Sequence, residues 1–180
     1  MIENALTTQT LRMEAFPQSL EAFDGMYNQM ATTPEGAVMM FIVAMDTYIR
    51  NEELGKQCFG LCFHPQKRNG DLPDNHFLSF MHDRFYRNSQ EWLARSYFEG
   101  SSPENGYQIS APYTMKVRRK ATDRDYLTSM DADVEKCWVH SSGADSDRPA
   151  QVLRVKGETL YYIFSYGGIP SQIRPPKRQY

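Results

Sequence analysis

Apolar residues fill one segment in the first half of the chain almost completely. The run from Gly36 to Ile49 is apolar nearly all round, which is typical of a helix that is buried on every side. Thr33 supplies an N-cap residue, Pro34 occupies the first helical position, and Glu35 places an acid in the first turn. The pattern therefore predicts a central, buried helix that begins near residue 34.

Helical spacing continues beyond this run. The stretch EELGKQCFGLCF carries apolar residues at spacings of four, three and one, which form a stripe along one side of a helix; they are Leu54, Cys58, Leu61 and Cys62. Proline and glycine then mark a loop over residues 64–73. A helix capped by Asp74 or Asn75 and a short helix over residues 91–98 complete the expected helical half.

In the second half of the chain, apolar and polar residues alternate. The segment Tyr113–Arg118 places apolar residues at every second position, which is the pattern of a half-buried strand. Three further segments have strand-forming residues bounded by turn residues, and they cover residues 134–140, 150–156 and 159–166. These short, closely spaced segments predict an antiparallel meander.

Together the two patterns predict an α+β protein. A helical N-terminal half is expected to pack on one face of an antiparallel β-meander from the C-terminal half. We expect a single domain over residues 1–180, because this length is enough for one hydrophobic core. Within it, residues 1–100 are mainly helical, residues 108–170 form the sheet, and residues 171–180 extend as a tail.

Composition and charge narrow the class of protein. A hydrophobic fraction of 41% is that of a globular chain, and a net charge of -2 gives no overall attraction to nucleic acid. The most apolar run, Ala37–Met45, is far shorter than the roughly 20 residues that cross a bilayer. The chain starts without the pattern of a secretory signal, and its 3 cysteines argue against a disulfide framework. We expect a cytoplasmic protein without membrane attachment or cofactor, in an oligomeric state that stays open.

Residues 140–151, HSSGADSDRPAQ, gather residue types that occur both in catalytic centres and in turns. His140 and Ser141 are neighbours, and adjacent side chains on a strand point to opposite faces, so they are poorly placed to act as base and nucleophile. Asp145 and Asp147 are two acids without the other oxygen ligands of a calcium loop. We expect no catalytic residue and no metal site in this stretch.

A hairpin connection explains more of the same stretch. Gly143 is expected to supply the positive φ that a connecting turn commonly needs, and Asp145 can bond back to the nearby backbone. Arg148 is expected to pair with Asp145 or Asp147 and hold the loop closed. Because recognition residues often lie on loops, this charge could also be displayed to a partner.

Three ordered blocks of residues form a set within the second half. They are RSYFEGSSPENGY, SSGADSDRP and IRPPK, and they span about Arg95 to Lys177. The set resembles a family of bacterial proteins described as a domain of unknown function. The resemblance implies a shared fold, and it brings no catalytic residues. The chain departs from the family at Asp147, where proline is more usual, and this departure loosens the expected turn.

Two other groups have both a chemical and a structural interpretation. Cys58, Cys62 and His64 are ligand types that zinc takes, but a second matched pair is missing, and we favour core packing. A basic group could form a patch for an acidic partner or a phosphate backbone, or simply a solvated strand face. Its members are Lys116, Arg118, Arg119, Lys120, Arg124, Arg174, Lys177 and Arg178.

Aromatic residues gather late in the chain, and strand alternation divides them between two faces. Tyr162, Phe164 and Tyr166 share one face, and Tyr161 and Ile163 share the other. One face must belong to the core. The other is expected to be covered by a helix or exposed, and exposed tyrosines would suit a protein interface.

The sequence carries no complete nucleophile, acid–base, phosphate-loop or metal arrangement. We therefore expect a noncatalytic module that binds another protein and, as a narrower hypothesis, an immunity protein that neutralises a toxin. The expected binding residues are Asp145, Asp147, Arg148, Lys116, Arg118 and Arg174. The alternative is a small enzyme or small-ligand binder with a pocket between helices and sheet, whose polar groups would be Glu99, Glu104, His140, Asp145 and Arg148.

Overall fold

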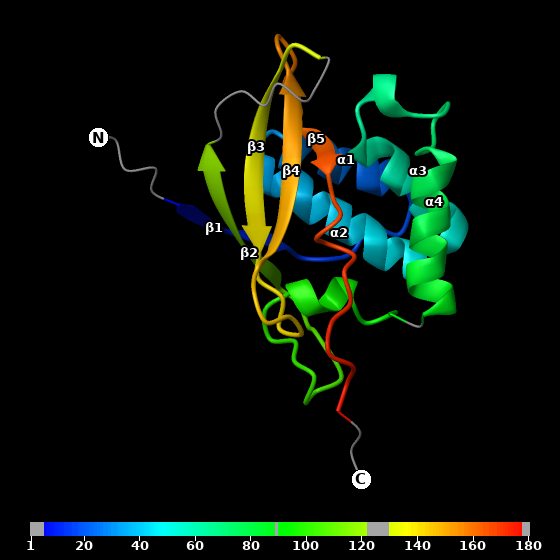
Figure 1. Ribbon diagram of the computed structural model, residues 1–180, viewed down its shortest axis with the longest axis vertical. Helices are drawn as coiled ribbons and strands as arrows, with labels where there is room; N and C mark the ends of the chain where they lie inside the picture. Colours follow the sequence, from blue (N-terminus) through cyan, green and yellow to red (C-terminus); the bar gives the residue numbers. More distant parts are fainter. Residues whose placement is uncertain (1–5, 89, 122–129, 178–180) are drawn as a thin grey trace.

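Helices cover one face of an antiparallel sheet, and Figure 1 shows the two layers side by side. The computed structural model describes residues 6–88, 90–121 and 130–177. In these ranges the helices are α1 (Leu20–Met30), α2 (Pro34–Arg50), α3 (Glu52–Cys62) and α4 (Asn75–His82). The strands are β1 (Thr7–Met13), β2 (Tyr113–Ala121), β3 (Ala132–Val139), β4 (Arg148–Val155) and β5 (Tyr162–Ser165). Short helical turns lie at Pro65–Lys67, Asp83–Arg87 and Ala94–Tyr97. The predicted α+β class is confirmed.

The described strands lie in the order β1-β2-β3-β4-β5, and every neighbouring pair is antiparallel. Strands β2 to β5 form the expected meander. Strand β1 extends this meander by pairing with β2 at the edge of the sheet, where Thr7 pairs with Arg119 and Met13 with Tyr113. The sequence pattern did not predict β1, because its first four residues are exposed and only Met13 is fully buried. The N-terminal half therefore contributes a strand to the sheet as well as the helices.

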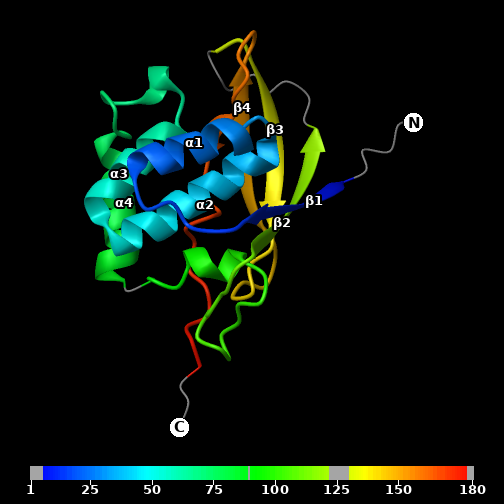
Figure 2. The ribbon, with the colours of Figure 1, turned by 180° about the vertical axis from the view of Figure 1, so that it is seen from behind.

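Helix α2 is the centre of the hydrophobic core, as its apolar sequence predicts. Every residue from Pro34 to Tyr48 is buried, and the helix contacts all five described strands as well as α1 and α3. Figure 2 shows α1 and α2 crossing the sheet together. The expected N-cap is present, since Thr33 Oγ accepts a hydrogen bond from the Gly36 amide at 3.1 Å. None of the helices in the described ranges is long and apolar enough to span a membrane.

One cluster of charges joins the start of α2 to the sheet. Arg119 of β2 faces the helical layer, where its Nε donates to Glu35 Oε1 at 2.7 Å. Its Nη1 donates to both carboxylate oxygens of Glu135 on β3, at 3.0 and 3.1 Å. The Glu35 side chain is only 2% exposed. Because a buried carboxylate is costly unless it is paired and hydrogen-bonded, this cluster favours one arrangement of helix and sheet.

Three of the late aromatic residues, Tyr161, Tyr162 and Tyr166, pack within the protein. Tyr161 is buried. The opposite set is covered by the helical layer, where the Tyr162 ring centre lies 5.9 Å from that of Tyr27, and the Tyr166 ring centre lies 4.9 Å from that of Phe77. These tyrosines therefore stabilise the helix–sheet interface, and the helix-covered alternative of the sequence analysis holds for them.

Candidate functional site

Three segments that are distant in the sequence meet at one end of the sheet. They are residues 94–107, residues 140–148 and residues 169–177, and we call them the loop platform; Figure 1 shows them together below the sheet in green, orange and red. Backbone hydrogen bonds join them. The Ser142 amide donates to the Ser96 carbonyl at 2.9 Å, and the Arg174 amide donates to the Gly143 carbonyl at 2.9 Å. The platform is therefore a single hydrogen-bonded unit rather than three separate loops.

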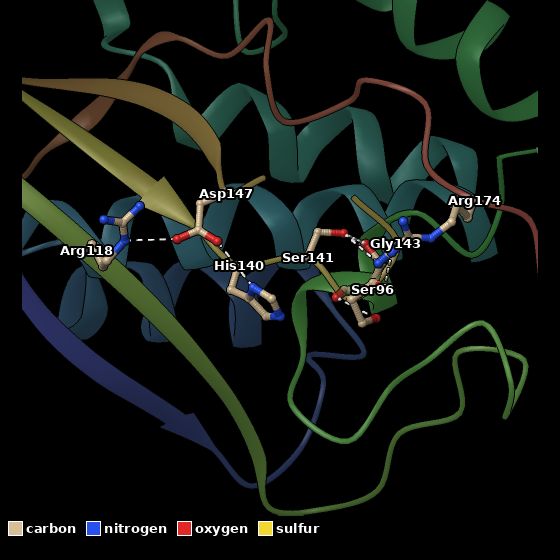
Figure 3. Close-up of polar contacts among 8 residues, drawn as sticks. Ser96, Arg118, His140, Ser141, Gly143, Asp147 and Arg174 are labelled. Atoms are coloured by element: carbon tan, nitrogen blue, oxygen red, sulfur yellow. Dashed lines mark hydrogen bonds and ion pairs between the residues drawn. The ribbon is translucent and has the colours of Figure 1, made fainter. Parts of the chain in front are cut away.

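A chain of hydroxyl groups fixes the centre of the platform. The Gly143 amide donates to Ser141 Oγ at 3.3 Å, Ser141 Oγ and Ser96 Oγ are 2.8 Å apart, and Ser96 Oγ donates to the Leu93 carbonyl at 2.6 Å. Both serines are 1% exposed. Buried hydroxyls need such partners, and this chain satisfies them. Figure 3 shows Ser141 directed towards Ser96. The serines therefore have a structural role that accounts for their burial.

Gly143 of the platform is required for space and not for its dihedral angles. Gly143 was expected to adopt a positive φ, but the positive-φ glycines of the described residues are Gly70, Gly100, Gly106 and Gly157. A Cβ atom on Gly143 would lie 2.4 Å from the Tyr107 hydroxyl and 3.0 Å from the Ile173 side chain. The expectation was wrong because sequence alone does not show that the tail crosses the loop at this residue.

Tyr107 connects the first segment of the platform to the tail. Its hydroxyl donates to the Arg174 carbonyl, and its φ is 58°. An aromatic residue rarely adopts this left-handed conformation, which costs on the order of 1–3 kcal/mol and persists only where the surroundings hold it. The strained conformation is an independent sign that the platform geometry is strongly constrained.

Asp147 receives two basic partners at the edge of the platform. Arg118 Nε donates to Asp147 Oδ2 at 2.9 Å, and His140 Nδ1 lies 3.2 Å from Asp147 Oδ1; Figure 3 shows the two basic side chains around the carboxylate. A histidine held by an aspartate supplies two of the three members of a catalytic triad. Among the described residues, however, no serine hydroxyl is hydrogen-bonded to His140, and Ser141 points to the opposite side.

The expected partner of the loop aspartates was wrong. Arg148 donates to the carbonyls of Gly168 and Gln172, at 3.3 and 2.7 Å, so it anchors the tail. Asp145 pairs instead with Arg174, with Nη1 and Oδ1 2.6 Å apart. Arg148 lies at the start of β4, where its side chain reaches the returning tail, and the sequence gives no distance between these two segments.

Acidic residues balance most of the basic group that the sequence suggested, although Lys120 lies opposite Lys136 in the strand register. Lys116 lies 3.7 Å from Glu99, and Lys177 lies 2.6 Å from Glu104. Arg118, Arg119 and Arg174 also have acidic partners. Arg124 and Arg178 lie outside the described residues. A mixed-charge surface of this kind does not favour a phosphate backbone as the partner.

A pocket of about 280 Å³ lies beside the platform. Glu99, Lys116 and His140 line it together with serines of the platform. It contains two of the five polar residues that the sequence analysis proposed for a pocket, whereas Glu104, Asp145 and Arg148 do not line it. The pocket therefore brings together only part of the proposed set.

A larger cleft, of about 500 Å³, also lies between helices and sheet, but none of the five polar residues proposed from the sequence lines it. Its lining includes Asp46, whose side chain is 2% exposed and which directly follows the apolar run Ala37–Met45 of α2. Burial raises the pKa of Asp46, and the neighbouring Arg50 opposes that shift. An acid following a long apolar run was a usable signal, but its second partner, Arg95, comes from a distant segment.

Cys58 and Cys62 belong to the hydrophobic core. Burial raises the pKa of the Cys58 thiol to about 12, and it also raises that of Cys62. His64 Nε2 lies 3.0 Å from Glu158 Oε2, and Nδ1 accepts a hydrogen bond from the Gln66 amide. No group of three or more potential metal ligands occurs within the described ranges. The packing interpretation accounts for these contacts.

The fold and the platform define a class: an α+β protein with a helical layer on a five-stranded meander, whose loops and tail join at one end of the sheet. Residues 15–177 match the family model described as Domain of unknown function (DUF6935), and the chain belongs to this family. The match includes all four described helices, so it extends well beyond the three blocks that carry the resemblance. No curated protein and no solved structure matches the chain.

Proposed function

We propose that this protein binds another protein through the loop platform and does not catalyse a reaction. The observation that carries the proposal is the joining of three distant segments into one hydrogen-bonded unit that holds charged side chains in the solvent. Asp145 and Arg174, for example, are 96% and 55% exposed. A preorganised surface loses little conformational entropy when a partner binds, which favours affinity.

The charges on the platform suit recognition better than stability. Exposed ion pairs such as Asp145–Arg174 and Glu104–Lys177 contribute only about 0–1 kcal/mol each to folding. They can therefore exchange their partners for groups on another protein at small cost. Alternating signs across a small area also favour one orientation of the partner over others.

The narrower form of the proposal is an immunity protein that neutralises a toxin in the bacterial cytoplasm. Support comes from the resemblance to bacterial sequences. A charged, preorganised surface is what such a protein would need to cover a toxin's active site. The partner expected on this basis carries a patch of complementary mixed charge.

The test exchanges the two members of the Asp145–Arg174 pair. The double variant Asp145→Arg, Arg174→Asp keeps an internal ion pair but reverses the charge pattern that a partner meets. The matched control exchanges Asp83 and Arg87, another exposed pair, with Nε and Oδ1 3.2 Å apart, outside the platform. Immobilised wild-type protein and both variants are compared for capture from cytoplasm, and any captured protein is purified and titrated.

The proposal predicts a stoichiometric partner that binds wild type and the control exchange but loses at least about tenfold in affinity for the platform exchange, as expected when charges become like-signed. Thermal melting establishes that both variants are folded. Equal binding by all three proteins, or no partner that forms a defined complex with wild type, would refute the proposal.

A further inference from the structure

The larger cleft lies between the C-terminal end of α2, the segment that links β1 to α1, and the start of β2. Its volume of about 500 Å³ lies within the range of small-molecule sites. The residues that matter chemically are Phe16, Asp46, Arg50, Leu54, Arg95 and Tyr113. Asp46, Arg50 and Arg95 form a charged part of the lining. Phe16, Leu54 and Tyr113 form an apolar part.

Two arginines converge on one buried carboxylate in this cleft. Arg50 follows Asp46 by one helical turn, and its Nε donates to Asp46 Oδ2 at 2.7 Å. Arg95 reaches the same carboxylate from another segment, with its Nε 3.2 Å from Oδ1. The three side chains together carry one excess positive charge. Glu14 also lines the cleft, but its carboxylate pairs at 2.7 Å with Arg12, a residue outside the lining.

The guanidinium groups retain donors for a further acceptor. A guanidinium has five N–H donors, and Arg95 uses only Nε for the hydrogen bond to Asp46. Within the described part of the chain, its two terminal amino groups have no hydrogen-bond acceptor. Arg50 adds only a long contact from Nη2 to Asp46 Oδ1, at 3.4 Å. Asp46 therefore holds both guanidiniums in place by their Nε atoms and leaves terminal N–H groups available.

The apolar part of the lining is built mainly from aromatic rings. The Phe16 and Tyr113 ring centres are 4.7 Å apart, and Phe16 also packs on Phe98 at 5.4 Å. Leu54 adds aliphatic surface. A ligand that fits this lining has a flat, apolar body together with an anionic group that reaches the arginines.

We propose that this cleft binds a small organic carboxylate with a flat apolar body, whose carboxylate accepts hydrogen bonds from Arg50 and Arg95. Guanidinium groups bind carboxylate and phosphate alike, and the charge count decides between them. One negative charge neutralises the single excess positive charge, whereas a phosphate dianion would add a second negative charge close to the buried Asp46. In this arrangement Asp46 is a positioning residue for the two arginines.

The test uses three probes of similar shape. Phenylacetate carries the carboxylate, phenylacetamide replaces it with a neutral amide, and phenyl phosphate replaces it with a dianion. Binding to the full-length protein is followed by two-dimensional amide NMR. Phenylacetate is expected to give saturable shifts in residues 14–18 and 46–54, with at least about tenfold weaker binding of the amide, because hydrogen bonds to charged groups are the stronger ones. Phenyl phosphate is expected to bind more weakly than phenylacetate.

Variants then assign the arginines. Arg50→Met and Arg95→Met are each expected to weaken phenylacetate binding by about tenfold or more. Arg87→Met is the matched control, since Arg87 is an exposed arginine that pairs with Asp83 away from the cleft, and it is expected to have no effect. Arg95 belongs to the first segment of the loop platform, but neither Asp145 nor Arg174 lines the cleft, so the Asp145–Arg174 exchange is also expected to leave binding unchanged.

Three results would overturn the inference. They are the absence of saturable shifts with phenylacetate, shifts that lie away from the cleft, and equal binding of phenylacetate and phenylacetamide. Tighter binding of phenyl phosphate would overturn the choice of a carboxylate ligand. If the arginine variants unfold because Asp46 loses a partner, the probe comparison on wild-type protein decides the question without them.

Discussion

Replacing Arg119 by methionine is the sharpest test of how the helical layer is joined to the sheet. The substitution keeps an unbranched side chain but removes the charge that pairs with Glu35 and Glu135. Glu35 is 2% exposed and would keep a buried carboxylate without its partner. Breaking a buried ion pair on one side typically costs about 3–5 kcal/mol. The favourable position of Glu35 in the first turn of α2 offsets only about 0.3–1 kcal/mol of this.

The neighbouring arginine provides a matched control. Arg118 lies on the same strand but points to the opposite face, where it pairs with Asp147, whose side chain is 23% exposed. Its guanidinium carbon also lies 5.9 Å from the Trp138 ring centre. Because both side chains remain partly in contact with solvent, the ion pair is expected to contribute about 0–1 kcal/mol and the cation–π contact about 0.5–1 kcal/mol. Arg118→Met should therefore cost clearly less than Arg119→Met.

The assay is urea unfolding of both variants, followed by circular dichroism. Arg119→Met is expected to lower the free energy of unfolding by about 3–5 kcal/mol, and Arg118→Met by about 2 kcal/mol or less. Adding Glu35→Gln to Arg119→Met should recover part of the loss, because a buried amide costs less than a buried carboxylate. Similar losses in the two single variants would refute the assigned role of the buried cluster.

Three further predictions follow from particular residues. Gly143→Ala should destabilise the protein by roughly 1–3 kcal/mol and expose the tail to proteolysis, because the added methyl meets Tyr107 and Ile173; Gly167→Ala, which has open space around it, is the control in thermal melting. For Asp46, burial raises the pKa from its ordinary value of 3.8, so the native state holds this proton to higher pH than the unfolded state does. The free energy of unfolding of wild type, measured relative to Asp46→Asn by urea titration, should consequently fall as the pH rises above 3.8, and a flat or rising difference would contradict this. The three buried cysteines should react with Ellman's reagent only as fast as the protein opens, because the thiolate is the reactive form and burial disfavours it; immediate reaction of a thiol in native protein would contradict their burial.

The parts of the fold that could be predicted are those in which local sequence and tertiary packing agree. Thr33, Pro34 and Glu35 mark the start of α2, and the apolar run after them matches its complete burial. The alternation of apolar and polar residues predicted β2 correctly, because one face of that strand contacts the helices and the other contacts solvent. The same rule failed for β1, whose exposed edge position needs almost no apolar residues.

The candidate sites were less predictable, because each depends on segments that meet only in three dimensions. The charges of residues 140–148 were recognised as displayed groups, yet the pairing of Asp145 with Arg174 depends on the return of the tail. The residues that line the cleft were missed altogether. Asp46 was not among the residues proposed from the sequence, and nothing in its neighbourhood points to Arg95.

The edge position of β1 also has a consequence for synthesis in the cell. Met13 pairs with Tyr113, so this strand leaves the ribosome one hundred residues before its partner. At about 5–20 residues per second, it waits for roughly 5–20 s while the helices between them are made. Its sequence, TTQTLRM, is mostly polar and includes the basic residue Arg12. Such a strand can remain unpaired in water during that time with little tendency to aggregate, which a more apolar edge strand could not do.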